Sequence, residues 1–381
     1  MAQKTFKGGA AAIAQVWTTT INSSTSSQTF SITLTDESGG TATATYTAGG
    51  AETTSTVATG LRAAVTASTD PRFKAVTVGG SAAIVTLTAN TSGVPFYPAT
   101  GGTGSFTATS MTTPNQGPND WNSPANWVEN AIPIASDNII LDGSNAIKYG
   151  LATGLAFGGV KAQSTFSGGV GAQGQYLSFT CTSFDWAGTG IAFINIGSSA
   201  IAPVVRGTAS QSAPACGLYL LGSAMTTLTA ISGSVDIAGG PGQTATVATI
   251  QLQPSGNSSL PRVNIGSGVT LTSLYHQNGI STLNCAATTV IANAGTVTTF
   301  GSGAVATVTN NGATVVSNSS GTITNLNWNA GTTDLTQSQV ARTVKNCTGN
   351  FGKGAQLLFD NSVITFSNKI AGSGRMTLTA A

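Results

Sequence analysis

A short repeat in the C-terminal half limits the folds that this chain can adopt. Asparagine is followed closely by glycine at Asn278-Gly279, Asn293-Ala294-Gly295, Asn311-Gly312 and Asn329-Ala330-Gly331, and the glycines are 16, 17 and 19 residues apart. This period is too short for propeller blades or helical repeats, but it matches one coil of a parallel β-helix, in which every coil turns at the same place. The repeat therefore predicts a β-helix, clearly over 263–335 and less clearly from 150 to 260, where loops blur the period.

The composition agrees with a fold built from short strands. Only 7% of the residues are charged, against roughly 25% in an average soluble domain. Hydrophobic residues still make up 40%, so the chain is not a charge-rich disordered protein. The remainder is rich in Gly, Thr, Ser and Asn, which suit strands and tight turns and disfavour long helices.

Residues 22–110 predict a small α/β domain. Apolar and polar residues alternate in 28–47 and again in 75–89, which is typical of two hairpins of half-buried strands. Between them, 53–68 carries apolar residues about four positions apart, which predicts a helix that ends at Asp70-Pro71. The turn-rich segment after the second hairpin is interpreted as a linker.

These patterns predict a mostly β chain, with a small N-terminal α/β domain followed by a single-stranded parallel β-helix. The predicted parts are an N-terminal arm (1–21), the small α/β docking domain (22–110), a linker with a Trp-rich lid (111–143) and the β-helix domain (144–381).

Residues 119–143 concentrate tryptophans, prolines and acids in a chain that otherwise has few of them. A β-helix must cover the open apolar end of its first coil, so we interpret this segment as a structural lid. Its residues are Trp121, Asn126, Trp127, Pro133 and Asp137. An alternative interpretation is a Ca²⁺ site at Asp137 and Asp142; acids that cap turns beside a strand explain the same pair.

The same residues carry a resemblance. The pattern W-x-x-x-x-N-W, then a proline and an acid before the strand Ile139-Ile140-Leu141, resembles the start of β-helical surface proteins and autotransporter-like proteins. The preceding unit, with SITLT, TSTVATGLRAAVTAS and AIVTLTA, resembles a small module of tailed-phage structural proteins such as tail sheaths. Together, opened by KTFKGGAAAIAQV, the two parts resemble tailed-phage virion structural proteins. No catalytic residue is implied by this resemblance.

The acids and the histidine argue against an enzyme. A polysaccharide depolymerase needs two carboxylates, or a carboxylate and a base, facing one groove. Residues 186–381 contain only Asp236, Asp334 and Asp360, and no two of them are one coil apart. His276 has no neighbouring acid or cysteine in sequence and is interpreted as a coil-corner residue. We therefore predict no catalytic residue, cofactor or metal, and the depolymerase remains as the second alternative.

The four cysteines, Cys181, Cys216, Cys285 and Cys347, form no CxxC pair, so they are interpreted as buried free thiols. A first alternative function is a tail fibre or tailspike that recognises a host-surface glycan. Under that alternative Trp186, Tyr219, Tyr275 and Trp328 stack on sugars, and otherwise they belong to the core.

Charge, hydropathy and the N-terminus indicate the compartment and the partners. The net charge is +2, and the basic groups near the C-terminus, interpreted as a solvated face, are not interleaved with aromatics as in a nucleic-acid groove. They are Arg342, Lys345, Lys353, Lys369 and Arg375. No segment is apolar enough to span a membrane, and the N-terminus does not read as a signal peptide.

We therefore expect a non-enzymatic virion protein made in the host cytoplasm, most simply a capsid decoration or head-fibre protein. Its expected partners are the major capsid protein or other virion proteins and further copies of itself, with a trimer as one arrangement. Neither nucleic acid nor membrane is an expected partner.

Overall fold

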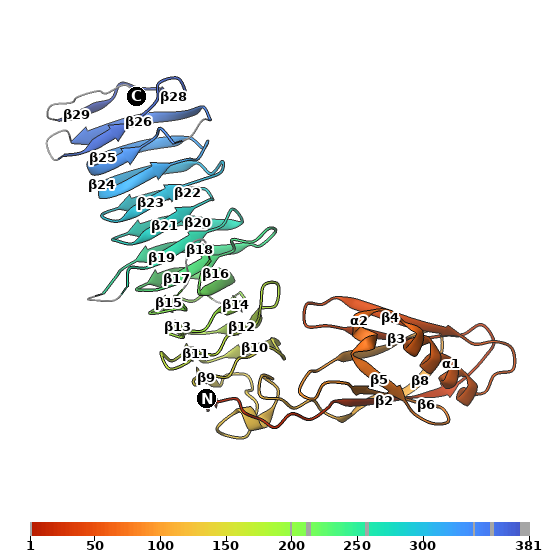
Figure 1. Cartoon of the computed structure of the whole chain (residues 1–381). Helices are drawn as coiled ribbons and strands as arrows, with labels where there is room; N and C mark the ends of the chain where they lie inside the picture. The colour runs from red at the N-terminus through yellow and green to blue at the C-terminus, as the bar shows by residue number, and fades with distance from the viewer. Residues whose placement is uncertain are drawn as a thin grey trace.

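The computed structural model describes residues 2–198, 200–210, 215–255, 259–337, 340–350 and 354–373. The chain is mostly β, with 51% strand and 6% helix, and forms a parallel β-solenoid of about 11 turns with a small N-terminal sheet domain. The small domain extends sideways from the base of the solenoid, so the two parts form an elbow (Figure 1). The predicted fold class is confirmed. Residues 374–381 of the predicted β-helix domain, with Arg375, and also Lys353, lie outside the described residues.

The small domain contains two antiparallel sheets, of strand order β5-β6-β2-β8 and β4-β3-β7. Its elements are β2 (Val16–Ser23), β3 (Thr29–Thr35), β4 (Thr41–Thr47), α1 (Thr54–Ala67), α2 (Pro71–Lys74), β5 (Val76–Gly79), β6 (Ile84–Ala89), β7 (Tyr97–Gly102) and β8 (Ser105–Thr113). Both predicted hairpins are present, as β3-β4 and β5-β6.

Helix α1 forms where the apolar period changes. Val57, Leu61 and Val65 are buried on its inner face, which contacts strands of both sheets. Thr53 caps its N-terminus in a capping box with Thr56, which satisfies amides that the first turn leaves open. The helix ends before Asp70-Pro71, as predicted. The same pair also starts α2, because the Asp70 side chain accepts from the Arg72 amide and proline suits the first helical position.

Two predicted boundaries differ from the structure. The segment predicted as an arm, 1–21, is no separate arm: it contains β1 (Gln3–Phe6), which belongs to the solenoid, and most of β2, a central strand of the four-stranded sheet. The turn-rich stretch read as the start of a linker forms β7 and β8, which add one strand to each sheet. Both pairings join residues far apart in sequence, so no local pattern reveals them.

The solenoid strands pair in parallel with strands of the preceding and following coils. After the 3-10 turn η1 (Pro124–Asn126) they are β9 (Asn138–Leu141), β10 (Ala152–Phe157), β11 (Gly159–Ala162), β12 (Leu177–Cys181), β13 (Phe184–Trp186), β14 (Ala192–Ile196), β15 (Val204–Val205), β16 (Leu218–Ala230), β17 (Ser234–Ile237), β18 (Ala245–Leu252), β19 (Arg262–Ile265), β20 (Val269–His276), β21 (Ile280–Leu283), β22 (Ala287–Ala292), β23 (Thr296–Thr299), β24 (Val305–Ser317), β25 (Ile323–Asp334), β26 (Arg342–Asn350), β27 (Gln356–Leu358), β28 (Ile364–Phe366) and β29 (Ala371–Ser373). The long strands β16, β24 and β25 bend around a corner and pair with two strands of a neighbouring coil.

The Asn-Gly repeat follows from the stacking of these corners. Asn311 donates to the side-chain oxygen of Asn293, and Asn329 donates to that of Asn311, each at 2.9 Å and across 18 residues. A side chain on Gly295 would place its Cβ 2.3 Å from the carbonyl oxygen of Gly279, so only glycine fits where the corners stack. Between 150 and 260 the coils are unequal, since register-paired residues lie 17 positions apart at Leu177 and Ile194 but 26 apart at Ala192 and Leu218, which explains the blurred period there.

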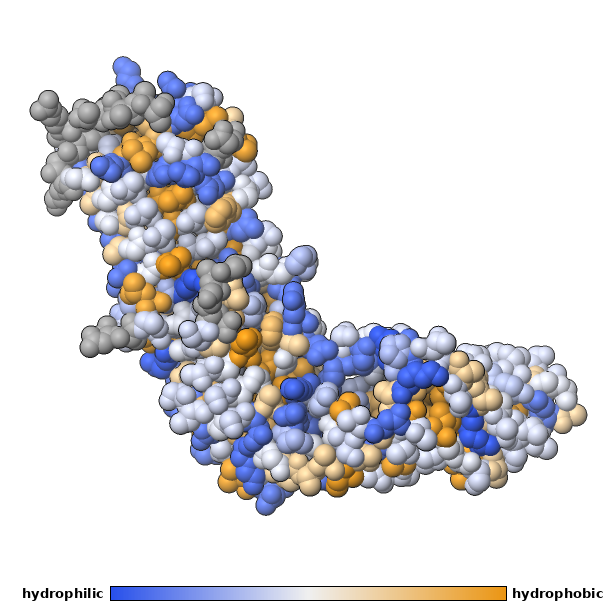
Figure 2. All heavy atoms as spheres, viewed as in Figure 1, coloured by the Kyte–Doolittle hydropathy of each residue, from blue (hydrophilic) through white to orange (hydrophobic). Residues whose placement is uncertain are grey.

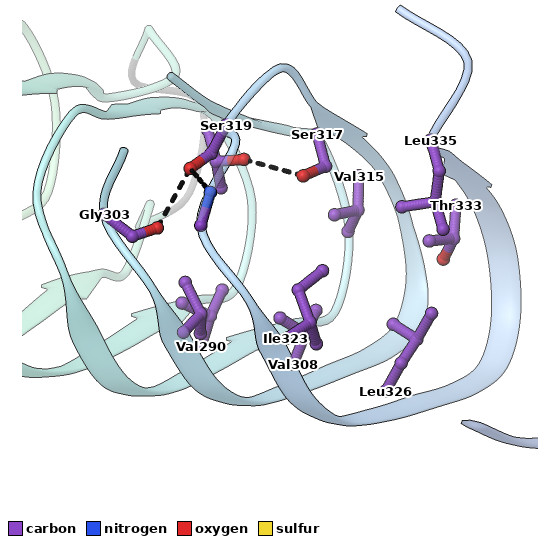
Figure 3. A pocket seen from close by; sticks show the side chains of 13 residues that line it. Val290, Gly303, Val308, Val315, Ser317, Ser319, Ile323, Leu326, Thr333 and Leu335 are labelled. Atoms are coloured by element: carbon purple, nitrogen blue, oxygen red, sulfur yellow. Dashed lines mark hydrogen bonds between the residues drawn. The ribbon is translucent and has the colours of Figure 1, made fainter. Parts of the chain in front are cut away.

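The interior near the C-terminal end is polar in places, and the hydroxyls that line its void are hydrogen bonded. A void of about 10 Å³ lies among valine, leucine, threonine and serine side chains (Figure 3). Thr299 donates to the Ser317 hydroxyl at 3.0 Å, and the Ser319 hydroxyl donates to the Gly303 carbonyl at 2.9 Å. The void holds one water at most and is too small for a ligand.

Arg342 is buried inside the last coils, contrary to its predicted place on a solvated basic face. Its guanidinium donates to the carbonyl oxygens of Ser317 (2.6 Å), Ser319 (2.8 Å) and Leu335 (2.5 Å). Burial lowers the pKa of Arg342, and the neighbouring Asp334 charge opposes that shift. The planar fork satisfies three carbonyls that the turns between coils leave without partners, which explains why a charge is buried there.

We predict that Arg342→Met destabilises the solenoid by about 2–4 kcal/mol, because three buried carbonyls lose their donors. Arg342→Lys keeps the charge but not the fork and should also destabilise. The control is Lys345→Met on the same strand, where the side chain is exposed and the expected change is within about 0.5 kcal/mol. Urea unfolding followed by circular dichroism measures all three, and equal stability of Arg342→Met and the wild type would contradict this role.

Candidate functional site: the joint at the solenoid base

The first strand of the solenoid comes from the N-terminus of the chain. Strand β1 pairs in parallel with β9, from Gln3 opposite Asn138 to Phe6 opposite Leu141, and β9 then pairs with β11. Strand β1 lies between the lid and β9, so β9 is not the outermost strand of the solenoid. The chain leaves the solenoid after one strand, builds the small domain and returns.

The returning chain covers the open edge of β1. The Val128 amide donates to the Thr5 carbonyl at 2.9 Å, and the Lys7 amide donates to the Asn126 carbonyl at 2.8 Å. The Thr5 amide donates to the Glu129 carboxylate at 2.9 Å. The edge of the first strand therefore has partners and does not offer a row of free groups to another chain.

The two tryptophans of the predicted lid close the apolar end of the core. Trp121 and Trp127 are 2% and 0% exposed, and their rings meet edge to face with centroids 4.7 Å apart. Trp127 also contacts Phe6 edge to face at 5.3 Å, and its indole nitrogen donates to the Trp121 carbonyl at 2.9 Å. The Trp121 ring also packs against the Phe157 ring, with centroids 6.0 Å apart, so the lid is in contact with the aromatic core of the first coils.

Asn126 holds the outgoing and returning segments together. Its buried side chain accepts from the Ala10 amide at 2.8 Å and donates to the carbonyls of Gly117 (2.7 Å) and Asp120 (2.8 Å). Its own carbonyl accepts from the amides of Lys7 and Gly8. The Asn126 side chain thus satisfies backbone groups of both the outgoing and the returning segment, at a place where neither segment has a sheet partner for these groups.

The chain turns out of the solenoid at Gly8, which has φ +66°. A Cβ there would lie 2.3 Å from the Cβ of Asn145, whose side chain donates to the Lys7 carbonyl. Further along, the Ile13 amide donates to the Gln116 carbonyl at 2.9 Å, so the two connecting segments also pair with each other. The sequence analysis did not predict a role for Phe6 in the joint, and the pair Gly8-Gly9 after KTF is the one local signal of it.

Pro133 and Asp137 shape the return into β9, and both are buried. The Asp137 carboxylate accepts from the Ala2 amide and from the Ile134 amide, each at 3.1 Å. Asp142, the other acid of the calcium interpretation, accepts from the Gly143 amide and the Thr165 hydroxyl. Both acids therefore accept from a nearby backbone amide, in agreement with the turn-capping alternative.

A polar contact connects the small domain to the solenoid beside the joint. Glu37, in the turn between β3 and β4, accepts from the Tyr97 hydroxyl at 2.5 Å and from the Gly150 amide at 3.2 Å. Partial burial and the Glu37 carboxylate raise the pKa of Tyr97, so this hydroxyl stays a donor at any physiological pH. The sequence analysis did not identify Glu37, because its partner lies 113 residues away.

The aromatic residues proposed to stack on sugars divide into two groups. Trp186 and Trp328 are 0% and 4% exposed and belong to the core. Tyr275 is 39% exposed on β20, and Tyr219 is half-buried on the outer face of β16. Only the two tyrosines are therefore accessible to a ligand.

Asp236 and Asp334 are too far apart to form a pair suited to glycoside hydrolysis. Strand register places Asp334 in the same column as Asp236, five strand steps along. At about 4.8 Å per step the two lie about 24 Å apart, against at most about 9.5 Å for a glycosidase pair. Burial raises the pKa of Asp334, but hydrogen bonds from Thr336 and Gln337 and the Arg342 charge together lower it below its ordinary value. Hydrogen bonds from Ser362 lower the pKa of Asp360. Both carboxyls are thus poor general acids at neutral pH.

His276 lies just before the Asn278-Gly279 coil corner, where it was predicted, and its side chain is buried. It ends β20, is 0% exposed and hydrogen bonds through Nδ1 to the Ser281 hydroxyl at 2.8 Å. Burial lowers the pKa of His276 to about 4. All four cysteines are buried thiols and none is in a disulfide, as predicted, and burial raises their pKa, that of Cys285 to about 11. These are inert core thiols.

We predict that Asn126→Ala destabilises the protein by about 2–4 kcal/mol and opens the joint, because the Ala10 amide and two carbonyls lose buried partners. Limited proteolysis should then cut near 8–13 or 114–120 at a protease dose that leaves the wild type intact. Asn122→Ala, at an exposed position of the same segment, is the matched control. If Asn126→Ala resists protease as well as this control does, Asn126 does not hold the joint.

His276 predicts a pH dependence of stability. The unfolded histidine titrates near its ordinary pKa of 6.5 and the folded one near 4, so the unfolded chain binds the proton first. The stability contributed by the neutral ring is fully present above about pH 6.5 and is lost as pH falls toward 4, by about 3 kcal/mol. Because the chain has one histidine, His276→Gln should remove most of this slope in urea titrations between pH 7 and 4.5. An unchanged slope would contradict the assignment.

Within the described residues, no helix has the length and apolarity to cross a membrane. No group of three or more His, Cys, Asp or Glu side chains in that part of the chain has a metal-binding arrangement. No protein-family model, curated protein or solved structure matches the chain.

Proposed function

We propose that the protein is a non-enzymatic structural component of the surface of a tailed-phage particle, as a capsid decoration or head-fibre protein. The observation that carries the proposal is the joint: the small domain is inserted between the first and second strands of the solenoid and is held there by buried hydrogen bonds. Such a joint suits a rigid spacer with a docking domain at its base.

The surface supports this interpretation. Much of the visible surface in Figure 2 is of intermediate hydropathy, with hydrophilic and hydrophobic residues scattered over it, and only 7% of the residues of the chain are charged. In the lid segment Val128, Ile132 and Ile134 are 54%, 41% and 64% exposed. Exposed apolar side chains in a segment at the base of the solenoid suit contact with another protein, so the base is the surface we assign to the particle.

The placement of the carboxylates supports a function without catalysis. Asp236 and Asp334 are too far apart to act together, and the lid residues serve backbone capping and packing. The depolymerase alternative predicts that the purified protein releases reducing ends or unsaturated products from host polysaccharide, and we expect none. Turnover that a single carboxylate substitution abolishes would overturn the proposal.

Copy number in purified particles tests the proposed place most directly. A decoration protein should be present in copies comparable with the major capsid protein, whereas a tail fibre or tailspike should be present in a handful to a few dozen. Quantitative mass spectrometry of particles gives the ratio. A low copy number confined to isolated tails would contradict the decoration assignment and favour the fibre alternative.

The base contact has its own test. Ile134→Asp places a charge on the assigned docking surface without touching the core, because this side chain is 64% exposed. We expect the variant to fold normally and to be lost from particles, whereas Ile280→Asp, at a 48% exposed position in the middle of the solenoid, is retained. Equal retention of both variants would contradict docking through the base.

A further inference from the structure

Three aromatic rings contact one another on the outside of the solenoid, and we call this cluster the aromatic platform. Phe193 on β14 and Tyr219 on β16 occupy register-paired positions of neighbouring coils, and their rings stack with centroids 4.5 Å apart and planes 5° from parallel. Tyr176, just before β12, meets Phe193 edge to face at 5.6 Å. The inward positions of β14 and β16 are already filled by aliphatic residues, such as Ile194 and Leu220, so the core does not need these rings.

Polar groups complete a hollow beside this platform. Asp236 is paired in register with Tyr219 on the next strand, β17, and the loop 239–243 encloses the other side. The hollow has a volume of about 280 Å³, near the lower end of the roughly 300–1,000 Å³ of small-molecule sites. The wall of the hollow needs a glycine at position 239, because a Cβ there would lie 2.3 Å from the Asp236 carboxylate.

The polar groups are fixed in place yet keep hydrogen-bonding capacity. The Asp236 carboxylate accepts from the Gly239 amide at 2.7 Å and from the Asn264 side chain at 2.5 Å, and a carboxylate has lone pairs for further donors. The Tyr176 hydroxyl accepts from the Gln243 side chain at 2.7 Å, so its own proton remains available to donate. The hollow therefore offers both an acceptor and a donor beside apolar ring faces.

We propose that this hollow binds a neutral saccharide unit. A sugar ring has an apolar face that suits an aromatic wall, and hydroxyls that both donate and accept. The residues that line the hollow include one carboxylate and no Lys or Arg, so anionic sugars and phosphates are disfavoured. The site is independent of where the protein lies in a particle, and binding in solution can be measured whatever the copy number proves to be.

The experiment uses the purified full-length protein and defined probes. Saturation-transfer NMR and isothermal titration are run with oligomers of glucose, of galactose and of N-acetylglucosamine, and with galacturonate oligomers and inorganic phosphate as anionic comparisons. We expect at least one neutral probe to bind with a dissociation constant in the millimolar range or tighter. No binding of any neutral probe at about 10 mM, or tighter binding of the anionic probes, overturns the proposal.

Substitutions locate the site. Tyr219→Ala should weaken binding about tenfold or more, whereas Tyr219→Phe keeps the ring and should bind nearly as well as the wild type. Tyr176→Phe removes one hydroxyl and should weaken binding less than loss of the Tyr219 ring. Tyr275→Ala removes an exposed tyrosine outside the hollow and is the matched control. Thermal unfolding verifies that each variant is folded, and if a folded Tyr219→Ala binds as well as Tyr275→Ala does, the hollow is not the site.

Discussion

The structure depends on one constraint of parallel solenoids: every coil finds its backbone partners in the neighbouring coils, so the first coil has an open edge and an open apolar end. This chain closes that end with its own N-terminus. Strand β1 supplies the outer strand, residues 126–129 cover its edge, and Trp121 and Trp127 cover the core. The closure requires the chain to pass the base twice, and Asn126 satisfies backbone groups on both passes.

The small domain follows from this closure. It has its own core, around Phe30, Ile32 and Leu61, separate from the core of the solenoid, and it is built from the chain between the two passes. Two paired connections and the Glu37 contact fix it more firmly than a single linker would. At the other end of the described solenoid, Arg342 serves turn carbonyls inside the last coils, so both ends depend on buried polar side chains that bond to backbone.

Much of the fold is predictable from the sequence, because its signals are local. The Asn-Gly corners repeat at coil spacing because each corner glycine lies against a backbone carbonyl of the preceding corner, which leaves no room for a Cβ. The hairpins and helix of the small domain follow from alternation and a change of period. The lid is predictable from the position of its tryptophans. The pairing of β1 with β9 is not, because it joins residues 135 positions apart with no local pattern.

The sites are harder to predict because the coil phase decides which side chains face out. Trp328 and Tyr275 are both aromatic residues in alternating strand segments of the sequence, yet Trp328 lies in the core and Tyr275 is exposed. The platform of Phe193 and Tyr219 could not be predicted for the same reason, because their coils are unequal in length and the sequence does not show which of their residues are paired. Arg342 resembled a surface charge because nothing local reveals that three carbonyls converge on it.

Hydrogen exchange at the base measures the central claim most directly, namely that the N-terminus and the returning segment form one closed, rigid end. The Lys7, Gly8 and Ala10 amides all donate to Asn126, and the Val128 amide donates to Thr5. The account predicts that these amides are protected as strongly as those of β9 and β11 in the coils that follow. Exchange of residues 5–10 and 126–128 at the rate of exposed loops, with β9 and β11 still protected, would contradict it.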